Sequence, residues 1–264
     1  MTAVDYRGQT TLITGASAGI GAEFARQLAA RGSDLVLVAR RRERLEELAA
    51  ELRAQHDVEV HVIAIDLATD NPGQALAERL EQLGLRVTSL INNAGFGSFG
   101  PFHQAEPERL RREIAVDVTA VADISRAFIE QLRTAGRGVL VNVASMAAYQ
   151  PNPRMALYGA SKAFVLSLTE ALWEESRGTG LRVLALSPGA TRTEFFEVVG
   201  TDRAAGGTRL AAPADVVSTA LATLDRRNPP PSVIVGRTNR MMAVLARRLA
   251  TRRQVIRAVG RLTA

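Results

Sequence analysis

The stretch TTLITGASAGIG, residues 10–21, decides the fold of this chain. Its first five residues predict a short strand, and Gly15, Gly19 and Gly21 open a helix that begins near Ile20. Glycines let the backbone turn sharply and approach a pyrophosphate, whose charge meets free N–H groups at the helix N-terminus. The alternative is a tight turn built from small residues. Because strand, turn and helix follow in the required order, the stretch predicts a dinucleotide site.

Short apolar runs separated by helix-length segments continue along the chain. Several runs are apolar on both faces, which a parallel sheet buried between two helical layers requires. Further strands are predicted at 34–39, 58–65, 87–92, 138–144, 181–187 and 232–236. The pattern predicts an α/β fold, a Rossmann-like doubly wound parallel sheet of about seven strands with helices on both faces. Residues 1–236 are expected to form this single domain, with residues 190–212 as a loop that covers ligands.

Composition excludes several classes of protein. The 264 residues are 47% hydrophobic and 23% charged, which is typical of a globular protein. There is no cysteine, and His56, His61 and His103 lack the spacing of metal ligands, so we expect no metal site. The N-terminus has no secretion signal and no run is long enough to span a bilayer, so we expect a soluble, cytoplasmic protein.

The net charge of +6 is unevenly distributed. Residues 226–264 hold ten arginines and no acid, which leaves 23 basic and 27 acidic groups in residues 1–225, a net charge of −4. Residues 237–264 form a basic amphipathic C-terminal tail, and residues 239–264 of it read as a helix. One side of this helix carries Met241, Met242, Leu245, Leu249, Ile256 and Val259, interrupted by Arg248 and Arg252. Docking on the acidic body or on a second subunit is favoured. The alternatives are peripheral contact with an anionic membrane and, least favoured, nucleic acid.

The end of the second predicted strand indicates which nicotinamide cofactor is bound. Enzymes that use NAD place an acid here to hold the ribose hydroxyls, whereas a 2′-phosphate calls for arginine. The position holds Arg40, followed by Arg41, so the sequence predicts NADP(H). For Arg42 and Arg44 a solvated helix start is favoured, in which Arg42 pairs with Glu46 at i,i+4.

Six motifs in one order resemble the short-chain dehydrogenase/reductase family over roughly residues 8–236. They are TGASAGIG, Asp66, NNAG at 92–95, Ser145, YGASK at 158–162 and PGATRT at 188–193. The resemblance implies an NADP(H)-dependent oxidoreductase that interconverts a ketone and a secondary alcohol, and usually a homo-oligomer.

The resemblance also assigns candidate cofactor-binding residues. Asp66 would contact the adenine, Asn92 and Ala94 would line the adenosine side, and Pro188, Gly189 and Thr193 would hold the nicotinamide amide and phosphates. The full candidate set is Gly15, Ser17, Ala18, Gly19, Ile20, Gly21, Arg40, Asp66, Leu67, Asn92, Ala94, Gly95, Tyr158, Lys162, Pro188, Gly189, Thr191 and Thr193.

The chain carries one lysine, Lys162, against 32 arginines, and it lies four residues after Tyr158. Hydride transfer to a ketone creates an alkoxide that needs a proton, which a tyrosine can supply. A cation about 4 Å away at an effective dielectric constant near 20 favours the phenolate by ~4 kcal/mol, roughly three pK units. An i,i+4 spacing places both side chains on one helix face. Ser145, at the end of a strand, would hydrogen-bond the substrate oxygen. Ser145, Tyr158 and Lys162 match the catalytic residues of the family.

One position departs from the family pattern. Where the family usually has an asparagine that supports a proton relay behind the lysine, this chain has Asp117. A carboxylate can still bind water, but its charge partly offsets the pull of the lysine on the tyrosine. The alternative is that Asp117 caps a helix or pairs with an arginine. We include Asp117 among the candidate catalytic residues and leave its role open.

The substrate is predicted only as a class. Phe-, Met- and Val-rich segments at 96–102, 146–155 and 194–200 surround the expected nicotinamide site, which favours an apolar acyl, steroid or terpenoid-like carbonyl compound. The competing function is an NADP(H)-binding regulatory module without turnover, and sugar-nucleotide epimerase chemistry fits poorly. His103 is expected to be a surface residue.

Overall fold

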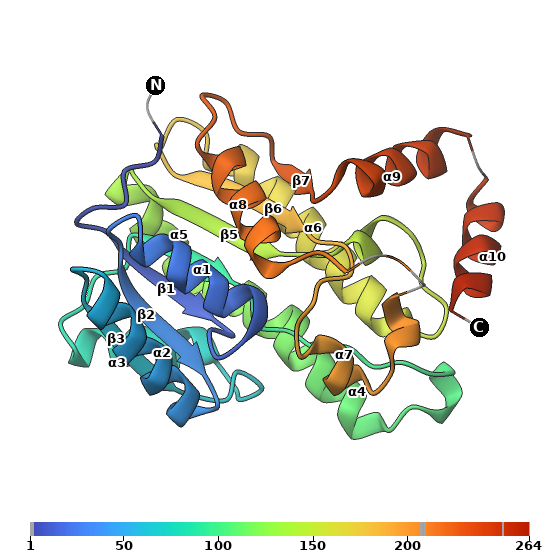
Figure 1. The fold of residues 1–264 in the computed structure, drawn as a ribbon, viewed down its shortest axis with the longest axis horizontal. Coiled ribbons are helices and arrows are strands. Elements are labelled where there is room, and N and C mark those ends of the chain that lie inside the picture. The colour runs from blue at the N-terminus through green and yellow to red at the C-terminus, as the bar shows by residue number, and fades with distance from the viewer. Residues whose placement is uncertain (1–2, 206–207, 209, 250, 264) are drawn as a thin grey trace.

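The sheet has the predicted doubly wound topology. The computed structural model describes residues 3–205, 208, 210–249 and 251–263, without the side chains of 202–203 and 244–249. Over these residues seven parallel strands pair in the order β3-β2-β1-β4-β5-β6-β7 (Figure 1). The strands are β1 Thr10–Thr14, β2 Asp34–Ala39, β3 Val60–Ala64, β4 Ser89–Asn92, β5 Val139–Val143, β6 Arg182–Ser187 and β7 Ser232–Ile234. The order reverses between β1 and β4, which opens a crevice at their carboxyl ends.

Helices cover both faces of the sheet, so both faces are apolar. On β1, Ile13 packs in the cluster under α1, α2 and α8, and Leu12 packs in the cluster under α3 and α5. The helices are α1 Gly19–Ala29, α2 Arg42–Gln55, α3 Pro72–Gln82, α4 Pro107–Ile114, α5 Ala120–Ala135, α6 Ala156–Glu175, α7 Phe195–Val199, α8 Pro213–Leu224, α9 Arg237–Leu249 and α10 Arg252–Leu262. Because alternate side chains enter opposite clusters, the strands carry apolar side chains on both faces of the sheet, as the sequence pattern required.

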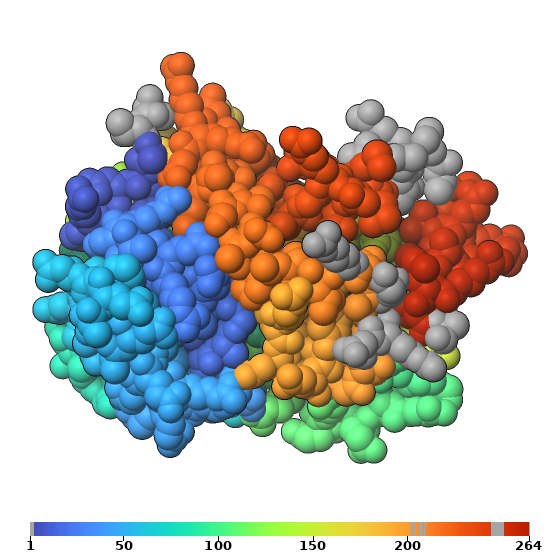
Figure 2. Space-filling view, viewed as in Figure 1, coloured from blue at the N-terminus to red at the C-terminus, as the bar shows by residue number. Residues whose placement is uncertain are grey.

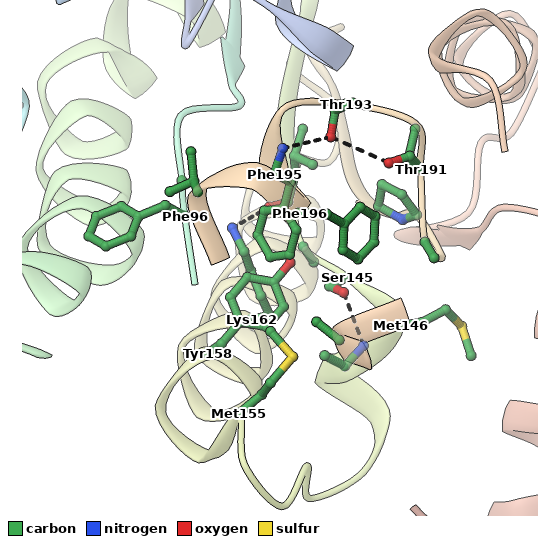
Figure 3. A pocket seen from close by; sticks show the side chains of 18 of the residues that line it. Phe96, Ser145, Met146, Met155, Tyr158, Lys162, Thr191, Thr193, Phe195 and Phe196 are labelled. Carbon is green, nitrogen blue, oxygen red and sulfur yellow. Dashed lines mark hydrogen bonds between the residues drawn. The ribbon is translucent and has the colours of Figure 1, made fainter. Parts of the chain in front are cut away.

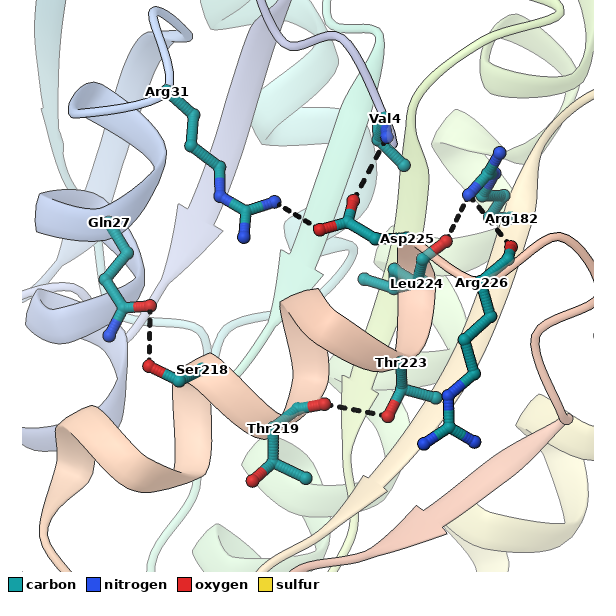
Figure 4. Close-up of polar contacts among 10 residues, drawn as sticks. All are labelled: Val4, Gln27, Arg31, Arg182, Ser218, Thr219, Thr223, Leu224, Asp225 and Arg226. Atoms are coloured by element: carbon teal, nitrogen blue, oxygen red, sulfur yellow. Dashed lines mark hydrogen bonds and ion pairs between the residues drawn. The ribbon is translucent and has the colours of Figure 1, made fainter. Parts of the chain in front are cut away.

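Polar contacts at the end of α8 hold the N-terminal segment in place (Figure 4). The Asp225 carboxylate accepts a hydrogen bond from the Val4 amide at 3.0 Å and pairs with Arg31 at 2.9 Å. Arg182 donates to the carbonyl oxygens of Leu224 and Arg226. The bonds to Asp225 reach Val4 and Arg31, which lie 221 and 194 residues away along the chain, and fix α8 beside α1.

The C-terminal tail is two helices, so the prediction of one continuous helix was wrong. Thr251 begins α10: its hydroxyl accepts from the Gln254 amide, and the Gln254 side chain accepts from the Thr251 amide. This capping box starts a new helix where apolar periodicity alone predicts a continuation. The predicted face residues Leu245 and Leu249 lie in the part whose side chains are outside the described residues. None of the described helices combines the length and apolarity needed to cross a bilayer.

Candidate active site

A cavity of about 1110 Å³ lies beyond the carboxyl ends of the strands. Its walls come from the glycine-rich turn, the ends of β2 to β6, the loop that carries α7, and the tail helices. Loops and helix N-termini meet here because parallel strands all end at the same edge of the sheet. The predicted ligand-covering loop at 190–212 contributes Thr191, Thr193 and the helix α7; its residues 206, 207 and 209 lie outside the described residues.

The glycine turn has a shape that only glycine allows. Gly15 and Gly19 have φ of +67° and +56°, in the left-handed region. A Cβ on Gly21 would lie 2.3 Å from the Gly15 carbonyl oxygen, and one on Gly19 would lie 2.8 Å from Thr193 Cγ2. A side chain at Gly19 or Gly21 would therefore collide with the protein's own atoms, so glycine keeps the turn tight, and residues 17–20 of this turn form a cradle along the cavity. A pyrophosphate at the N-terminus of α1 fits this cradle.

Asn93 holds this turn against β4. Its side-chain amide donates to the carbonyl oxygens of Thr14 and Gly15, at 3.0 and 3.3 Å. The Thr14 hydroxyl accepts from the Asn93 and Ala94 amides. The candidate Asn92, in contrast, is buried within the sheet, where it donates to Ser125 and to Asn142. The structure thus brings Asn93, rather than Asn92, to the cavity.

The basic end of the cavity lies at β2 and α2. Arg40 and Arg41 line it, and Arg41 donates to the Ser17 hydroxyl at 3.1 Å. Glu194, before α7, pairs with Arg41 at 2.8 Å and also with Arg44. Burial opposes ionisation of Glu194, but hydrogen bonds from Arg44 and Arg41 outweigh it and hold the pKa of Glu194 below its usual value. The predicted Arg42–Glu46 pair is confirmed at 3.5 Å.

The three candidate catalytic residues meet at the other end of the cavity (Figure 3). Ser145 follows β5 with an extended backbone, and its hydroxyl accepts from the Ala147 amide at 3.1 Å. Tyr158 and Lys162 lie on one face of α6, with the Lys162 Nζ 5.7 Å from the centre of the Tyr158 ring. Lys162 also donates to the Val143 carbonyl oxygen at 3.2 Å. A proton donor, a hydroxyl and an ammonium therefore converge on one region.

The pKa of Tyr158 corrects the electrostatic expectation. Burial raises this pKa above its usual 10.0, and the opposing pull of the Lys162 ammonium and the Ser145 hydroxyl does not cancel it. Asp117 and Glu113 raise it further. The lysine acts in the expected direction, but the expectation left out the cost of burying a phenolate.

Asp117 lies directly behind the lysine, and the charge of Lys162 also acts on Glu113. Both acids are fully buried. Asp117 belongs to a π-helical segment, Ala115–Thr119, that joins α4 to α5, and such segments are frequent at functional sites. Its Oδ1 accepts from the Phe96 amide at 3.2 Å and lies 3.7 Å from Lys162 Nζ. Burial raises the pKa of Asp117 to about 6, although Lys162 and the Phe96 amide lower it. Asp117 therefore pairs with the lysine rather than with an arginine.

The catalytic end of the cavity is apolar. The Phe195 ring packs at 5.3 Å from the Tyr158 ring and edge-on to Phe196. Met146 and Met155 line the same region (Figure 3). A Cβ on Gly97 would come within 3.3 Å of three of these side chains, so the loop after β4 passes close to them.

The tail forms the remaining wall of the cavity. Met242, Val255, Val259 and Leu262 line it from α9 and α10. Thr263 donates to the Pro153 carbonyl oxygen at 3.3 Å, and Asn239 lies against Gly189. In Figure 2 the C-terminal helices, in red, lie beside the orange segment that carries α7. The tail thus packs against the body, as the favoured reading predicted.

Most of the candidate residues line the cavity. The exceptions are Asp117, Asn92 and Gly21, of which the last supports the turn from behind. Asp66 lines the cavity and pairs with Arg112 of α4. The sequence reading missed Asn93, Arg112, Glu113 and Asn239. Only Asn93 had a signal, its place in NNAG; the other three depend on tertiary packing.

Comparison with known proteins agrees with this geometry. The family described as short chain dehydrogenase matches residues 9–204. The chain belongs to the short-chain dehydrogenase family. A sulfoacetaldehyde reductase of Chromohalobacter salexigens is 40% identical over 197 residues, which cover 73% of this chain and 77% of that protein.

Two solved short-chain dehydrogenases show the same fold with different cofactors. One from Sphingobium yanoikuyae, in complex with NADPH, has a TM-score of 0.80 at 36% identity and covers 95% of both chains. One from Burkholderia phymatum, in complex with NAD, has a TM-score of 0.81 at 27% identity, covering 92% of this chain and 94% of that chain. The chain is therefore an oxidoreductase acting on CH–OH and C=O groups of small molecules with a nicotinamide cofactor.

Proposed function

We propose that this protein is an NADP(H)-dependent oxidoreductase that interconverts an apolar ketone and its secondary alcohol. The observation that carries the proposal is the convergence of Ser145, Tyr158 and Lys162 at the apolar end of one cavity whose other end is basic. When bound, the nicotinamide supplies or accepts the hydride. Ser145 holds the substrate oxygen, Tyr158 gives or takes its proton, and Lys162 stabilises the phenolate and holds the ribose hydroxyls.

The preference for NADP(H) is supported by Arg40 and Arg41. Both line the cavity at the end of β2, where an NAD enzyme places an acid. The Ser17 hydroxyl, already hydrogen-bonded to Arg41, would supply a further contact to a 2′-phosphate. We propose that the cofactor is also held by the candidate residues that line the same cavity, which are Gly15, Ser17, Ala18, Gly19, Ile20, Asp66, Leu67, Ala94, Gly95, Pro188, Gly189, Thr191 and Thr193.

The apolar substrate class is supported by Phe195, Phe196, Met146 and Met155 at the catalytic end. We propose the tail, residues 237–264, as a part added to the 1–236 domain that closes the substrate end of the cavity. We further propose a cytoplasmic homo-oligomer. Light scattering with the purified protein tests the oligomer, and pelleting with anionic vesicles tests the membrane contact left as an alternative.

The function is tested by following NADPH oxidation with a panel of bulky apolar ketones, acyl ketones and sulfoacetaldehyde. We expect turnover with apolar ketones, faster with NADPH than with NADH. Tyr158→Phe should lose activity by a factor on the order of 10² or more while it still binds NADPH, because only the proton donor is removed. The Arg40→Ala, Arg41→Ala double variant should lose the preference for NADPH.

The competing reading is a regulatory module that binds NADP(H) without turnover. Tight NADPH binding with no oxidation across the whole panel would favour that module. Turnover unchanged in Tyr158→Phe would contradict the catalytic assignment.

A further inference from the structure

Glu113, near the end of α4, is fully buried. Neither carboxylate oxygen has a hydrogen-bond partner of ordinary geometry among the described residues, and only the nearby Ser98 hydroxyl acts on the group as a hydrogen-bond donor. Burying a carboxylate with so little compensation is costly, and an apolar residue of similar volume would fill the same space without that cost. Glu113 does not line the cavity, so it binds neither cofactor nor substrate. Neither packing nor ligand binding therefore explains why an acidic residue lies at this position.

The groups whose charges or hydrogen bonds act on Glu113 come from four parts of the fold. Arg109 lies one turn earlier on α4, Asp117 one turn later, Ser98 on the loop after β4, and Lys162 on α6. The Arg109 guanidinium is engaged elsewhere, since it donates to the Ser98 hydroxyl and to the carbonyl oxygens of Gly97 and Val198. Lys162 contacts Asp117, and its charge also acts on Glu113. Two buried carboxyl groups are thus opposed by one buried ammonium, and electroneutrality favours one proton on the two carboxyl groups.

Of the two buried carboxyl groups, Asp117 is the one that contacts the lysine. Its Oδ1 lies 3.7 Å from Lys162 Nζ, and its Oδ2 has no hydrogen-bond partner among the described residues. Gly95 allows the approach, because a Cβ there would lie 2.4 Å from Asp117 Oδ1 and 3.0 Å from Lys162 Nζ. The backbone thus leaves room for the carboxylate and the ammonium to face each other.

We propose that Glu113 and Asp117 together hold one proton behind Lys162 and return it, through the ammonium, to Tyr158 after each ketone reduction. The proposal rests on the proposed function. Glu113 touches no reacting atom and is a positioning residue for the proton.

The protons and electrons balance at each step. The dihydronicotinamide gives two electrons as a hydride to the carbonyl carbon, the C=O π bond breaks, and the Tyr158 hydroxyl proton moves to the oxygen. Lys162 then protonates the phenolate, the Glu113–Asp117 pair reprotonates Lys162, and solvent returns one proton to the pair. Oxidation of the alcohol runs the same steps in reverse.

The charge environment of Glu113 agrees with a group that holds a proton near neutral pH. Burial raises the pKa of Glu113 to about 7, and the negative charge of Asp117 adds to this rise. The hydrogen bond from Ser98 and the positive charges of Arg109 and Lys162 act in the opposite direction. Above this pH the two carboxyl groups lose the shared proton, so they have none to give to Lys162 and Tyr158.

The test compares Glu113→Gln with the wild type over a pH range, with Glu130→Gln, an exposed acid on α5, as the matched control. Glutamine keeps the shape but carries no titratable proton. We expect Glu113→Gln to lower kcat for reduction on the order of tenfold at about pH 6, and the difference to narrow above about pH 8, where the wild-type pair is also deprotonated. KM for NADPH should change less than about twofold. Glu130→Gln should match the wild type throughout.

A readout without substrate completes the test. The infrared spectrum should contain a protonated carboxylic acid band near pH 6 that disappears near pH 9. The band should be weaker in Glu113→Gln, where only Asp117 can hold the proton, and should keep its full intensity in Glu130→Gln. A wild type that turns over ketones while Glu113→Gln lowers kcat by the same factor at every pH would overturn the inference and leave the proposed function intact. An infrared spectrum without that band would overturn it too. A wild type with no turnover overturns the proposed function and, with it, the proton return.

Discussion

The buried acid Glu113 makes the stability of the folded protein depend on pH in a way that can be worked out in advance. Burial raises the pKa of Glu113 from its usual 4.5 to about 7, so the folded state keeps a proton that the unfolded chain gives up. The contribution of Glu113 to stability is therefore complete below about pH 4.5 and is lost as pH rises through about 7. At about 1.36 kcal/mol per pK unit, the shift of about 2.5 units amounts to ~3 kcal/mol. Asp117, whose pKa burial raises to about 6, acts in the same direction.

Glu113→Gln removes the contribution of Glu113 to the pH dependence of the free energy of unfolding. The amide carries buried donors of its own, so the absolute stability at a single pH does not isolate the effect, whereas the slope against pH does. Denaturant unfolding between about pH 5 and 8 should show the wild type losing ~3 kcal/mol more than the variant, about 6 to 12 °C in Tm for a chain of this size.

Two comparisons make this prediction decisive. Glu130→Gln removes an exposed carboxylate and should keep the wild-type slope. Glu113→Met should flatten the slope as Glu113→Gln does, because the effect comes from the lost titration and not from the amide. If Glu113→Gln keeps the full wild-type slope, the carboxyl is ionised in the folded state and the reasoning is refuted.

Three further changes follow from contacts in the structure. Gly19→Ala places a Cβ 2.8 Å from Thr193 Cγ2 on a backbone with φ +56°. We expect the free energy of unfolding to fall by ~1–2 kcal/mol in denaturant and NADPH to bind more weakly by calorimetry. Unchanged binding would contradict the phosphate cradle. Glu194→Gln frees Arg41, so NADPH should bind up to about fivefold more tightly and NADH should not, by fluorescence titration; an equal gain for both cofactors would be inconsistent with a 2′-phosphate site. Asp225→Ala leaves Arg31 without its partner and should cost ~1–2 kcal/mol in thermal unfolding, with catalysis unaffected.

The fold and much of the site could be predicted because each depends on local sequence. Strand runs and the glycine spacing of residues 10–21 fix the crossover pattern, and the i,i+4 relation of Tyr158 and Lys162 places both on one helix face. The misassignment in NNAG has a physical cause. All four residues of β4 are buried, so alternation gives no sign of which asparagine points into the sheet and which faces the turn. The break before Thr251 was missed because the apolar periodicity continues across a capping box.

The buried face of helix α4, PERLRREI, could not be predicted from its hydrophobic pattern, because tertiary packing buries an acid and exposes an apolar residue. A hydrophobic face would bury Ile114, yet Ile114 is 42% exposed while the neighbouring Glu113 is fully buried. A π-helical segment with i,i+5 hydrogen bonds follows α4. The helix α4 packs against α6 and is bonded through Arg109 to the loop after β4, so these contacts decide which of its side chains are buried. A sequence under pressure only to fill that space would place an apolar residue at 113. Instead this position holds an acid that is fully buried and feels the charge of Lys162, the only lysine of the chain. A proton-holding role explains why a costly acid lies at this place, and packing does not.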